Sequence, residues 1–258
     1  MRHFAMLVIV SGGFWPFLAQ AMPLPDCAGD IVVSRAHTVR VEKDGALILA
    51  DGRAAVLEGI RLPAADLPAI TLAREAIGAL WQLTLGAPLV LTSTPPRQDR
   101  YGRIRVQAFD RVWLQTALLE RGLARVEIGP DRSECAPDLY EAEAKARAAG
   151  LGVWATARYA VKQASSLTPD LAGRFELVEG QVTNASIHGG RGFLDFSQNY
   201  RQGFSATVAP EDRKTFRKAG FALEDLVGRH VRLRGVIEAF GGRPEIALSN
   251  PYQIEVLD

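Results

Sequence analysis

The chain has few of the residues that build metal and redox sites. Its 258 residues include two cysteines, three methionines and four histidines. The histidines are scattered along the sequence, at His3, His37, His188 and His230. Neither a CxxC nor an HxxxH spacing occurs, and these are the spacings typical of protein zinc sites. A GxxxxGK[ST] phosphate-binding loop is also absent. The sequence therefore predicts no metal-binding residues and no resident cofactor.

The chain also lacks an excess of charge of either sign. Thirty Lys and Arg stand against 29 Asp and Glu, a formal net charge of +1, and loss of Arg2 with an N-terminal segment would leave 29 of each. Sequence-independent nucleic-acid binding needs surplus cations, so this balance argues against binding by the whole surface. The most basic run is Arg213–Lys218. We interpret it as a solvated helix face, with local nucleic-acid contact as the alternative.

After residue 21, no stretch is apolar and long enough to cross a membrane. Met1–Ala21 resembles a secretory signal peptide, because Arg2 supplies a basic end, an apolar core follows, and Ala19-Gln20-Ala21 fits a small-x-small cleavage site. We expect cleavage before Met22 and a periplasmic or secreted mature protein. An uncleaved membrane anchor is the alternative.

Two cysteines in an exported chain, Cys27 and Cys135, suggest a disulfide. The bridge would close a loop of about 108 residues and stabilise the fold by roughly 4–5 kcal/mol on the chain-entropy model. A zinc site is a rival interpretation. Two free thiols are another, because a bridge requires Cβ atoms that face each other.

Strand and helix patterns divide the chain into a first domain at 22–156, a linker at 157–172 and a second domain at 173–258. In the first domain, β-prone runs and a hairpin around an Asp-Gly turn precede a helix with apolar residues at helical spacing. The predicted strands are 31–34, 37–43, 45–49, 54–60, 87–92 and 104–109, and the predicted helices are 67–83, 113–121 and 138–149.

The second domain reads as a small β domain with one helix. Val231–Glu238 alternates apolar and charged residues, the pattern of a half-buried strand. The predicted strands are 175–183, 192–196, 203–208, 230–240 and 244–248, with a short sixth at 253–256, and the predicted helix is 210–219. Residues 157–172 have little periodicity, which is typical of a linker.

The stretch Asp99-Arg100-Tyr101-Gly102-Arg103 stands between the predicted strands at 87–92 and 104–109. It places cations and an aromatic ring at the start of a strand. An arginine held on rigid β-structure can meet a phosphate with its planar set of donors. A solvated hairpin tip is the alternative for so short a motif.

A series of further motifs surrounds this stretch in order. They are Asp44-Gly45, 57–63, 113–115, 121–126, 142–147 and 150–154. Together the set resembles the staphylococcal nuclease (thermonuclease) family over roughly residues 36–156. The resemblance implies a mainly β fold with helices (α+β), an OB-type barrel in the first domain. It also implies Ca²⁺-dependent phosphodiester cleavage, with Arg103 as a catalytic residue and Arg100, Tyr101 and Arg103 contacting substrate. The second domain is similar in pattern to a small OB-like barrel.

The chain departs from the family at most of the positions that carry this chemistry. The resemblance places metal-binding aspartates where this sequence has Ala46 and Arg61, an arginine at Val56, and a water-activating glutamate at Ala64. Arg103 is the catalytic position that is retained. A site rebuilt from nearby carboxylates is the alternative, and the candidates are Asp44, Glu58 and Asp66.

We therefore expect an exported protein with a nuclease-like fold that binds nucleic acid or an envelope protein without catalysis. An active Ca²⁺-dependent endonuclease with a rearranged site is the runner-up. In a third hypothesis, both barrels dock other proteins.

Overall fold

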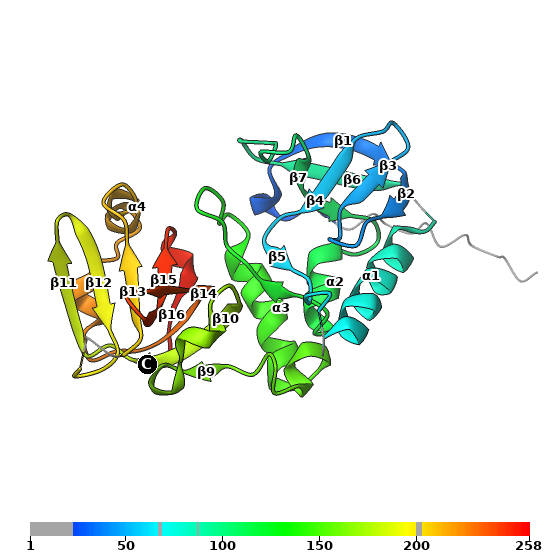
Figure 1. Cartoon of the computed structure of the whole chain (residues 1–258). Helices are drawn as coiled ribbons and strands as arrows, with labels where there is room; N and C mark the ends of the chain where they lie inside the picture. The colour runs from blue at the N-terminus through cyan, green and yellow to red at the C-terminus, as the bar shows by residue number, and fades with distance from the viewer. Residues whose placement is uncertain (1–22, 67–68, 87, 200–202) are drawn as a thin grey trace, which may run out of the picture.

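The computed structural model describes residues 23–66, 69–86, 88–199 and 203–258. The expected signal peptide, Met1–Ala21, lies outside the described residues. Two β domains lie side by side, with helices of the first domain between its barrel and the second domain (Figure 1). Within the described ranges, no helix has the length and apolar character to span a membrane.

The first sheet closes on itself through a bent N-terminal segment. Its strands are β1 (Asp30–Ala36), β2 (Thr38–Val41), β3 (Leu47–Leu49), β4 (Ala54–Leu57), β6 (Leu89–Ser93) and β7 (Ile104–Phe109), in the order β1-β6-β7-β4-β3-β2. Only His37 separates β1 from β2, so this one segment pairs with β6 on one side and β3 on the other. β4 and β7 run parallel. The result is an OB-type barrel, and the predicted fold class is confirmed.

Three helices cover this barrel: α1 (Ile70–Thr84), α2 (Leu114–Glu120) and α3 (Ala136–Ala148). In α1, Ala73, Ala76 and Leu80 recur at helical spacing and are buried. The predicted helix 67–83 is shifted slightly, and residues 67–68 lie outside the described ranges. A short pair, β5 (Ile60–Arg61) with β8 (Arg125–Val126), was not predicted as a pair.

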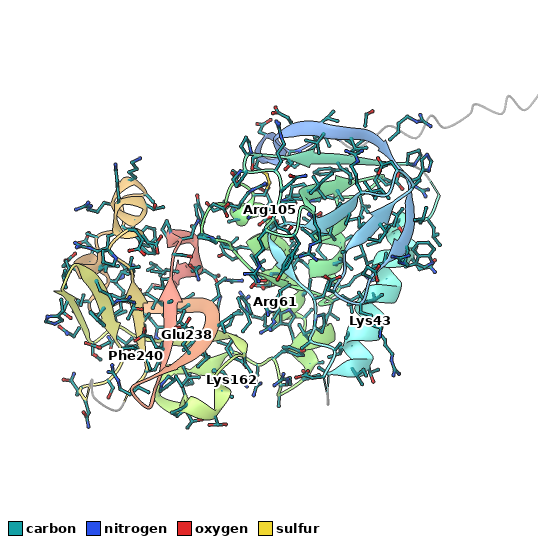
Figure 2. All side chains as sticks on the ribbon, turned by 45° about the horizontal axis from the view of Figure 1, so that its top comes forward. Lys43, Arg61, Arg105, Lys162, Glu238 and Phe240 are labelled. Carbon is teal, nitrogen blue, oxygen red and sulfur yellow. A yellow bond between two sulfur atoms is a disulfide. The ribbon has the colours of Figure 1, made fainter. Side chains whose placement is uncertain are left out.

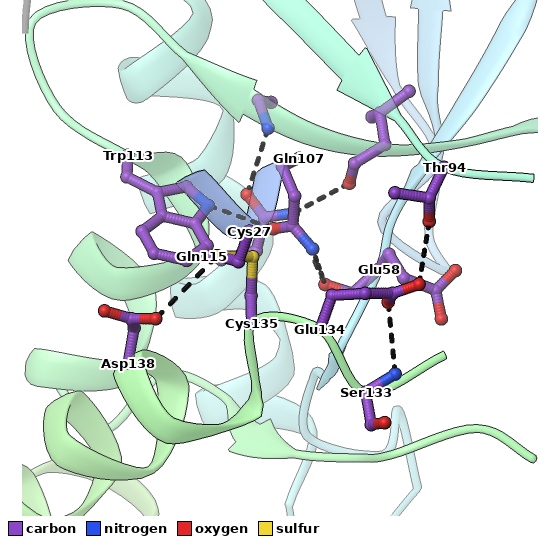
Figure 3. Close-up of a disulfide and its surroundings, with 12 residues drawn as sticks. Cys27, Glu58, Thr94, Gln107, Trp113, Gln115, Ser133, Glu134, Cys135 and Asp138 are labelled. Atoms are coloured by element: carbon purple, nitrogen blue, oxygen red, sulfur yellow. Dashed lines mark hydrogen bonds between the residues drawn. A yellow bond between two sulfur atoms is a disulfide. The ribbon is translucent and has the colours of Figure 1, made fainter. Parts of the chain in front are cut away.

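A disulfide fastens the N-terminal segment to the start of α3 (Figure 3). Cys27 lies in the 3-10 turn η1 (Asp26–Ala28), and Cys135 directly precedes α3. Their Cα atoms are 5.1 Å apart across 108 residues of sequence. The predicted pairing is confirmed, and the free-thiol and zinc alternatives are wrong.

The second domain repeats the strand order of the first. Its strands are β10 (Phe175–Gln181), β11 (Asn184–His188), β12 (Arg191–Asp195), β13 (Ser205–Val208), β14 (His230–Phe240), β15 (Arg243–Leu248) and β16 (Ile254–Val256). The order β11-β12-β13-β15-β14-β10 has a parallel pair, β13 with β15, where the first barrel has β4 with β7. The helix α4 (Arg213–Lys218) is shorter than predicted. β11 was missed, because its residues are exposed or half-buried and give no apolar alternation.

The segment expected as a linker contains ordered structure. β9 (Lys162–Gln163) runs parallel to β10, and Ala164 is buried in the core of the second domain. Short 3-10 turns complete the chain: η2 (Gly152–Ala155), η3 (Ala164–Ser166), η4 (Pro169–Leu171), η5 (Leu223–Leu226) and η6 (Pro251–Gln253). Residues 162–172 therefore pack on the second domain.

Buried polar contacts join the two domains. The Arg234 side chain on β14 is fully buried and donates to the Glu143 carboxylate on α3 at 3.0 Å. It also donates to the Val126 carbonyl at 3.0 Å and to Glu255, and its guanidinium lies 4.2 Å from the centre of the Tyr140 ring. A buried cation needs such partners to offset its desolvation. This cluster holds the barrels in one arrangement.

Candidate functional site

Four of the positions singled out by the family resemblance, Val56, Arg61, Ala64 and Arg103, line one cavity of about 600 Å³ on the first domain. Its walls come from the turn after β2, from β4 and β5, and from the start of β7. The charged lining residues are Lys43, Asp44, Arg61, Arg103 and Glu127, and the remainder are mostly apolar.

Arg103 enters this cavity already paired with two carboxylates. Its Nε donates to Asp99 Oδ2 at 2.7 Å and its Nη1 donates to Asp44 Oδ2 at 2.7 Å. Partial burial opposes the charged guanidinium, but the hydrogen bonds to Asp99 and Asp44 outweigh it and raise the pKa of Arg103. Burial likewise opposes ionisation of Asp99, yet hydrogen bonds from Arg103 and Tyr101 lower the pKa of that carboxyl. A ligand anion must therefore compete with two resident carboxylates.

The turn before Arg103 presents an aromatic ring to solvent. Tyr101 is 67% exposed. The guanidinium carbons of Arg100 and Arg103 lie 4.9 and 5.4 Å from the centre of its ring, within the range of a cation–π contact. Gly102 has a φ of +77°, which is the left-handed conformation that favours glycine in this tight turn. The structure thus brings together the three predicted substrate-binding residues.

Arg61 forms an ion pair that sequence reasoning missed. Its Nη1 donates to Glu127 Oε1 at 2.5 Å, and its guanidinium carbon lies 5.3 Å from the centre of the Phe175 ring in the second domain. The β5–β8 pair positions the two side chains, since Arg61 is opposite Arg125 and Glu127 follows that strand. Figure 2 labels Arg61 on the side of the first barrel that faces the second. The partners are 66 residues apart in sequence, and no local pattern marks them.

The other expected catalytic positions carry no functional group. Ala46 is buried, with 3% of its surface exposed. Val56 contributes an apolar wall to the cavity. Ala64 is exposed, and its backbone N–H donates to the Tyr159 hydroxyl at 3.2 Å. None of the three side chains has an oxygen to bind a cation or accept a proton.

Two of the three carboxylates proposed for a rebuilt site, Glu58 and Asp66, are engaged outside the cavity. Glu58 accepts two hydrogen bonds from Arg105, at 2.6 and 3.0 Å, and Arg105 also donates to Asp131. Asp66 pairs with Arg158 at 3.1 Å. Asp44 does line the cavity, where it holds Arg103. Across the described part of the chain, no group of three or more His, Cys, Asp or Glu is arranged to hold a metal ion.

The basic run Arg213–Lys218 forms α4 on the second domain, far along the chain from the cavity. Lys214, Arg217 and Lys218 are exposed, whereas Phe216 is buried in the domain core. Arg213 donates to the Gly190 carbonyl at 3.1 Å. The helix is therefore amphipathic, with its cations outward.

A comparison with protein-family models finds that residues 57–156 match the staphylococcal nuclease homologue family. Residues 57–156 therefore form a staphylococcal nuclease-like domain. The match includes Arg61, Ala64, Arg103 and Glu127, whereas Asp44 and Ala46 precede it and the second barrel follows it. A search of the curated proteins finds no match to the chain. The predicted resemblance is confirmed for this nuclease-like domain.

Proposed function

We propose that the protein is an exported, non-catalytic binding module in which ion pairs occupy the hydrolytic centre of a nuclease-like domain. The observation that carries this proposal is the Arg61–Glu127 pair inside the cavity. A guanidinium stands where the family resemblance expects a metal-binding aspartate. A cation at that position repels a divalent ion rather than binding it.

The side-chain oxygen atoms that line the cavity support the same proposal. Calcium takes six to eight oxygen ligands, several of them carboxylates. The two carboxylates that line the cavity, Asp44 and Glu127, each accept a hydrogen bond from an arginine. Ala46 and Ala64 offer no side-chain oxygen. These residues do not suit Ca²⁺, and among the described residues that line the cavity no carboxylate free of an arginine is available as a general base for water.

A protein ligand fits this chemistry best. Four of the five charged residues that line the cavity are paired with each other, as Arg61 with Glu127 and Arg103 with Asp44, and the chain as a whole has a net charge of only +1. Protein interfaces tolerate such mixed, paired charges, whereas nucleic-acid binding depends on surplus cations.

Weak contact with single-stranded nucleic acid is a second candidate, and the Tyr101 ring favours it. Exposed aromatic rings stack with bases of any sequence, and nearby arginines reinforce the contact. Tyr101 is exposed and flanked by the guanidinium groups of Arg100 and Arg103. This turn is the place where a nucleic acid would bind.

Export rests on two observations of different kinds. The N-terminal segment has the sequence of a signal peptide, and the Cys27–Cys135 disulfide suits an oxidising compartment. We therefore place the mature protein in the periplasm or outside the cell. Intact-mass measurement of exported protein would give a chain beginning at Met22. Retention of Met1–Ala21 would contradict this assignment.

A hydrolysis assay tests the non-catalytic proposal. Purified protein is incubated with single-stranded DNA and with RNA, in Ca²⁺ and in chelator, beside the Glu58→Gln and Asp66→Asn variants. We expect no chelator-sensitive cleavage in any sample. Robust Ca²⁺-dependent cleavage that is lost in one of these variants would overturn the proposal in favour of the rearranged nuclease.

A further inference from the structure

A second hollow of about 730 Å³ lies on the first domain, between β2 and α1. It adjoins the nuclease-type cavity, because Lys43 and Ala65 line both. The remainder of the groove runs along α1, on the side of the domain away from the second barrel (Figures 1 and 2). Neither the family positions nor the domain interface uses this surface.

Apolar side chains form the floor of the groove, and the space directly above Gly78 of α1 is empty. Val41, Ile70, Ile77 and Trp81 line it and are partly exposed. A Cβ added at Gly78 would meet no atom within 4 Å, so the hollow is open directly above this turn of α1. An apolar surface of this kind gains stability when a ligand covers it.

One wall of the groove is an unpaired strand edge. β2 stands at the end of the strand order and pairs with β3 alone among the described strands. Val39 on this strand lines the groove and is 55% exposed. An edge strand next to a helix is the arrangement in which an extended peptide adds a strand by β-augmentation. α1 has 15 residues and is about 22 Å long, which matches roughly six to seven residues of an added strand.

The charge of the groove selects an acidic ligand. Its cations are Arg40, Lys43 and Arg74, and none of the described lining residues is acidic. Arg40 is paired with Glu42 at 2.6 Å. The side chains of Lys43 and Arg74 have no ion-pair or hydrogen-bond partner among the described residues. A ligand carboxylate could accept hydrogen bonds from these two cationic side chains and pair with their charge.

We propose that this groove docks an extended, acidic segment of a partner protein. The segment adds a strand to the free edge of β2, lays alternate apolar side chains over Gly78 and Trp81, and presents a carboxylate to Arg74 and Lys43. This inference rests on the binding function proposed above and names the kind of partner. It involves neither Arg103 nor the Arg61–Glu127 pair.

The test begins with a phage-displayed library of random nine-residue peptides. Wild-type protein is the target, and the Gly78→Leu variant is used for counter-selection. Leucine at this exposed helical position fills the groove and raises helix propensity, so the variant is expected to fold at least as well as wild type. We expect enriched peptides with apolar residues at alternate positions and an Asp or Glu.

Synthetic versions of the enriched peptides are then titrated into the variants. We expect binding to weaken at least tenfold (about 1.4 kcal/mol) in Gly78→Leu and in Arg74→Glu. Binding should be unchanged in Lys214→Glu, a matched charge reversal on the exposed face of α4. Bound peptide should also slow amide hydrogen exchange at residues 39–41, which a purely charge-driven contact would leave unchanged.

Three results would overturn the proposal. The first is the absence of any peptide whose binding depends on both Gly78 and Arg74. The second is peptide binding without protection of residues 39–41. The third is Gly78-sensitive binding of the amphiphile dodecanoate when no peptide binds, which would assign the groove to acyl anions. Hydrolysis assays on Gly78→Leu keep the two proposals separate, because this change leaves the nuclease-type cavity intact.

Discussion

The two barrels have the same strand order, but their hollows differ. In the first, the connection from β4 to β6 contains β5 and the 15-residue α1, and hollows of about 600 and 730 Å³ lie beside it. In the second, the connection from β13 to β14 contains the six-residue α4 and η5, and the hollow there is only about 190 Å³. The connection between the third and fourth strands, rather than the strand order, decides where a ligand can bind.

The barrels also differ in what stabilises them. The first has the disulfide, and two of its ion pairs, Arg103–Asp44 and Arg61–Glu127, lie in the nuclease-type cavity. The second has no cysteine, and a cation from its β14 is buried against the first. Each domain therefore relies on a different kind of cross-link, and variants can separate their contributions.

The largest effect is expected at the domain interface. Arg234→Met removes one of the two arginines that pair with the buried Glu143 and leaves Arg147 as the other, and removing one partner of a buried ion pair costs about 3–5 kcal/mol. In chemical denaturation, both domains should unfold together in a single transition, and the free energy of unfolding should be lower by this amount in the variant. The exposed pair Arg229–Asp258 provides the control, since Arg229→Met should change stability by less than about 1 kcal/mol. Two separate unfolding transitions in the wild-type protein would show that the interface does not couple the barrels.

The disulfide comes second. Replacing both Cys27 and Cys135 by serine should lower the unfolding free energy by about 2–4 kcal/mol, the typical range for a disulfide, because the reduced chain regains the freedom of a long loop; residual structure in the unfolded chain keeps the loss below the chain-entropy value. The loss should be specific to the first barrel, and hydrogen exchange should therefore accelerate at β1 and α3 more than at β12 and β13. Equal acceleration in both barrels would contradict a local role.

The sequence predicted the bounds of strands well where apolar and polar residues alternate. β7 and β14 have the predicted bounds, 104–109 and 230–240, because apolar and polar residues alternate along them. The short strands β5, β8 and β9 have two residues each, too few for any periodicity. Their pairing depends on contacts between distant segments.

The site and the interface were harder to predict than the strands. The family resemblance identified Arg61 and Arg103 as positions of the nuclease site, but the sequence could not identify Glu127, whose role depends on the β5–β8 pairing. Arg234 lies on the charged face of an alternating strand, which sequence patterns assign to solvent. The first domain covers Arg234 and buries this side chain completely. Domain packing therefore overrides the local pattern.

The third effect concerns acid stability. Burial opposes ionisation of Glu255, but Arg234 outweighs burial and lowers the pKa of this carboxyl from its ordinary value of 4.5. Such a group stabilises the fold above the unfolded-state pKa, and the contribution is lost as pH falls through the folded-state pKa. The melting temperature of Glu255→Gln should therefore lie below wild type near neutrality and approach it below pH 4.5. A constant difference across this range would contradict the assignment.

The smallest effect is expected at the edge of the cavity. Arg103→Ala removes a partly exposed ion pair and should cost less than about 1 kcal/mol. Any weak binding of a fluorescent single-stranded oligonucleotide should decrease, because the Tyr101 turn loses a cation. Arg217→Ala on α4 is the control. If only the control weakened binding, nucleic-acid contact would belong to the second barrel instead.

Calorimetric titration of Ca²⁺ into the wild-type protein tests the central claim most directly. On the proposed function, the nuclease-type cavity does not bind Ca²⁺. Arg61 is a cation, and the side chains of Ala46 and Ala64 have no oxygen to coordinate the ion. We predict no saturable binding heat and no rise in melting temperature with Ca²⁺. Saturable binding that raises the melting temperature, and that is abolished by Asp44→Asn, would contradict the account.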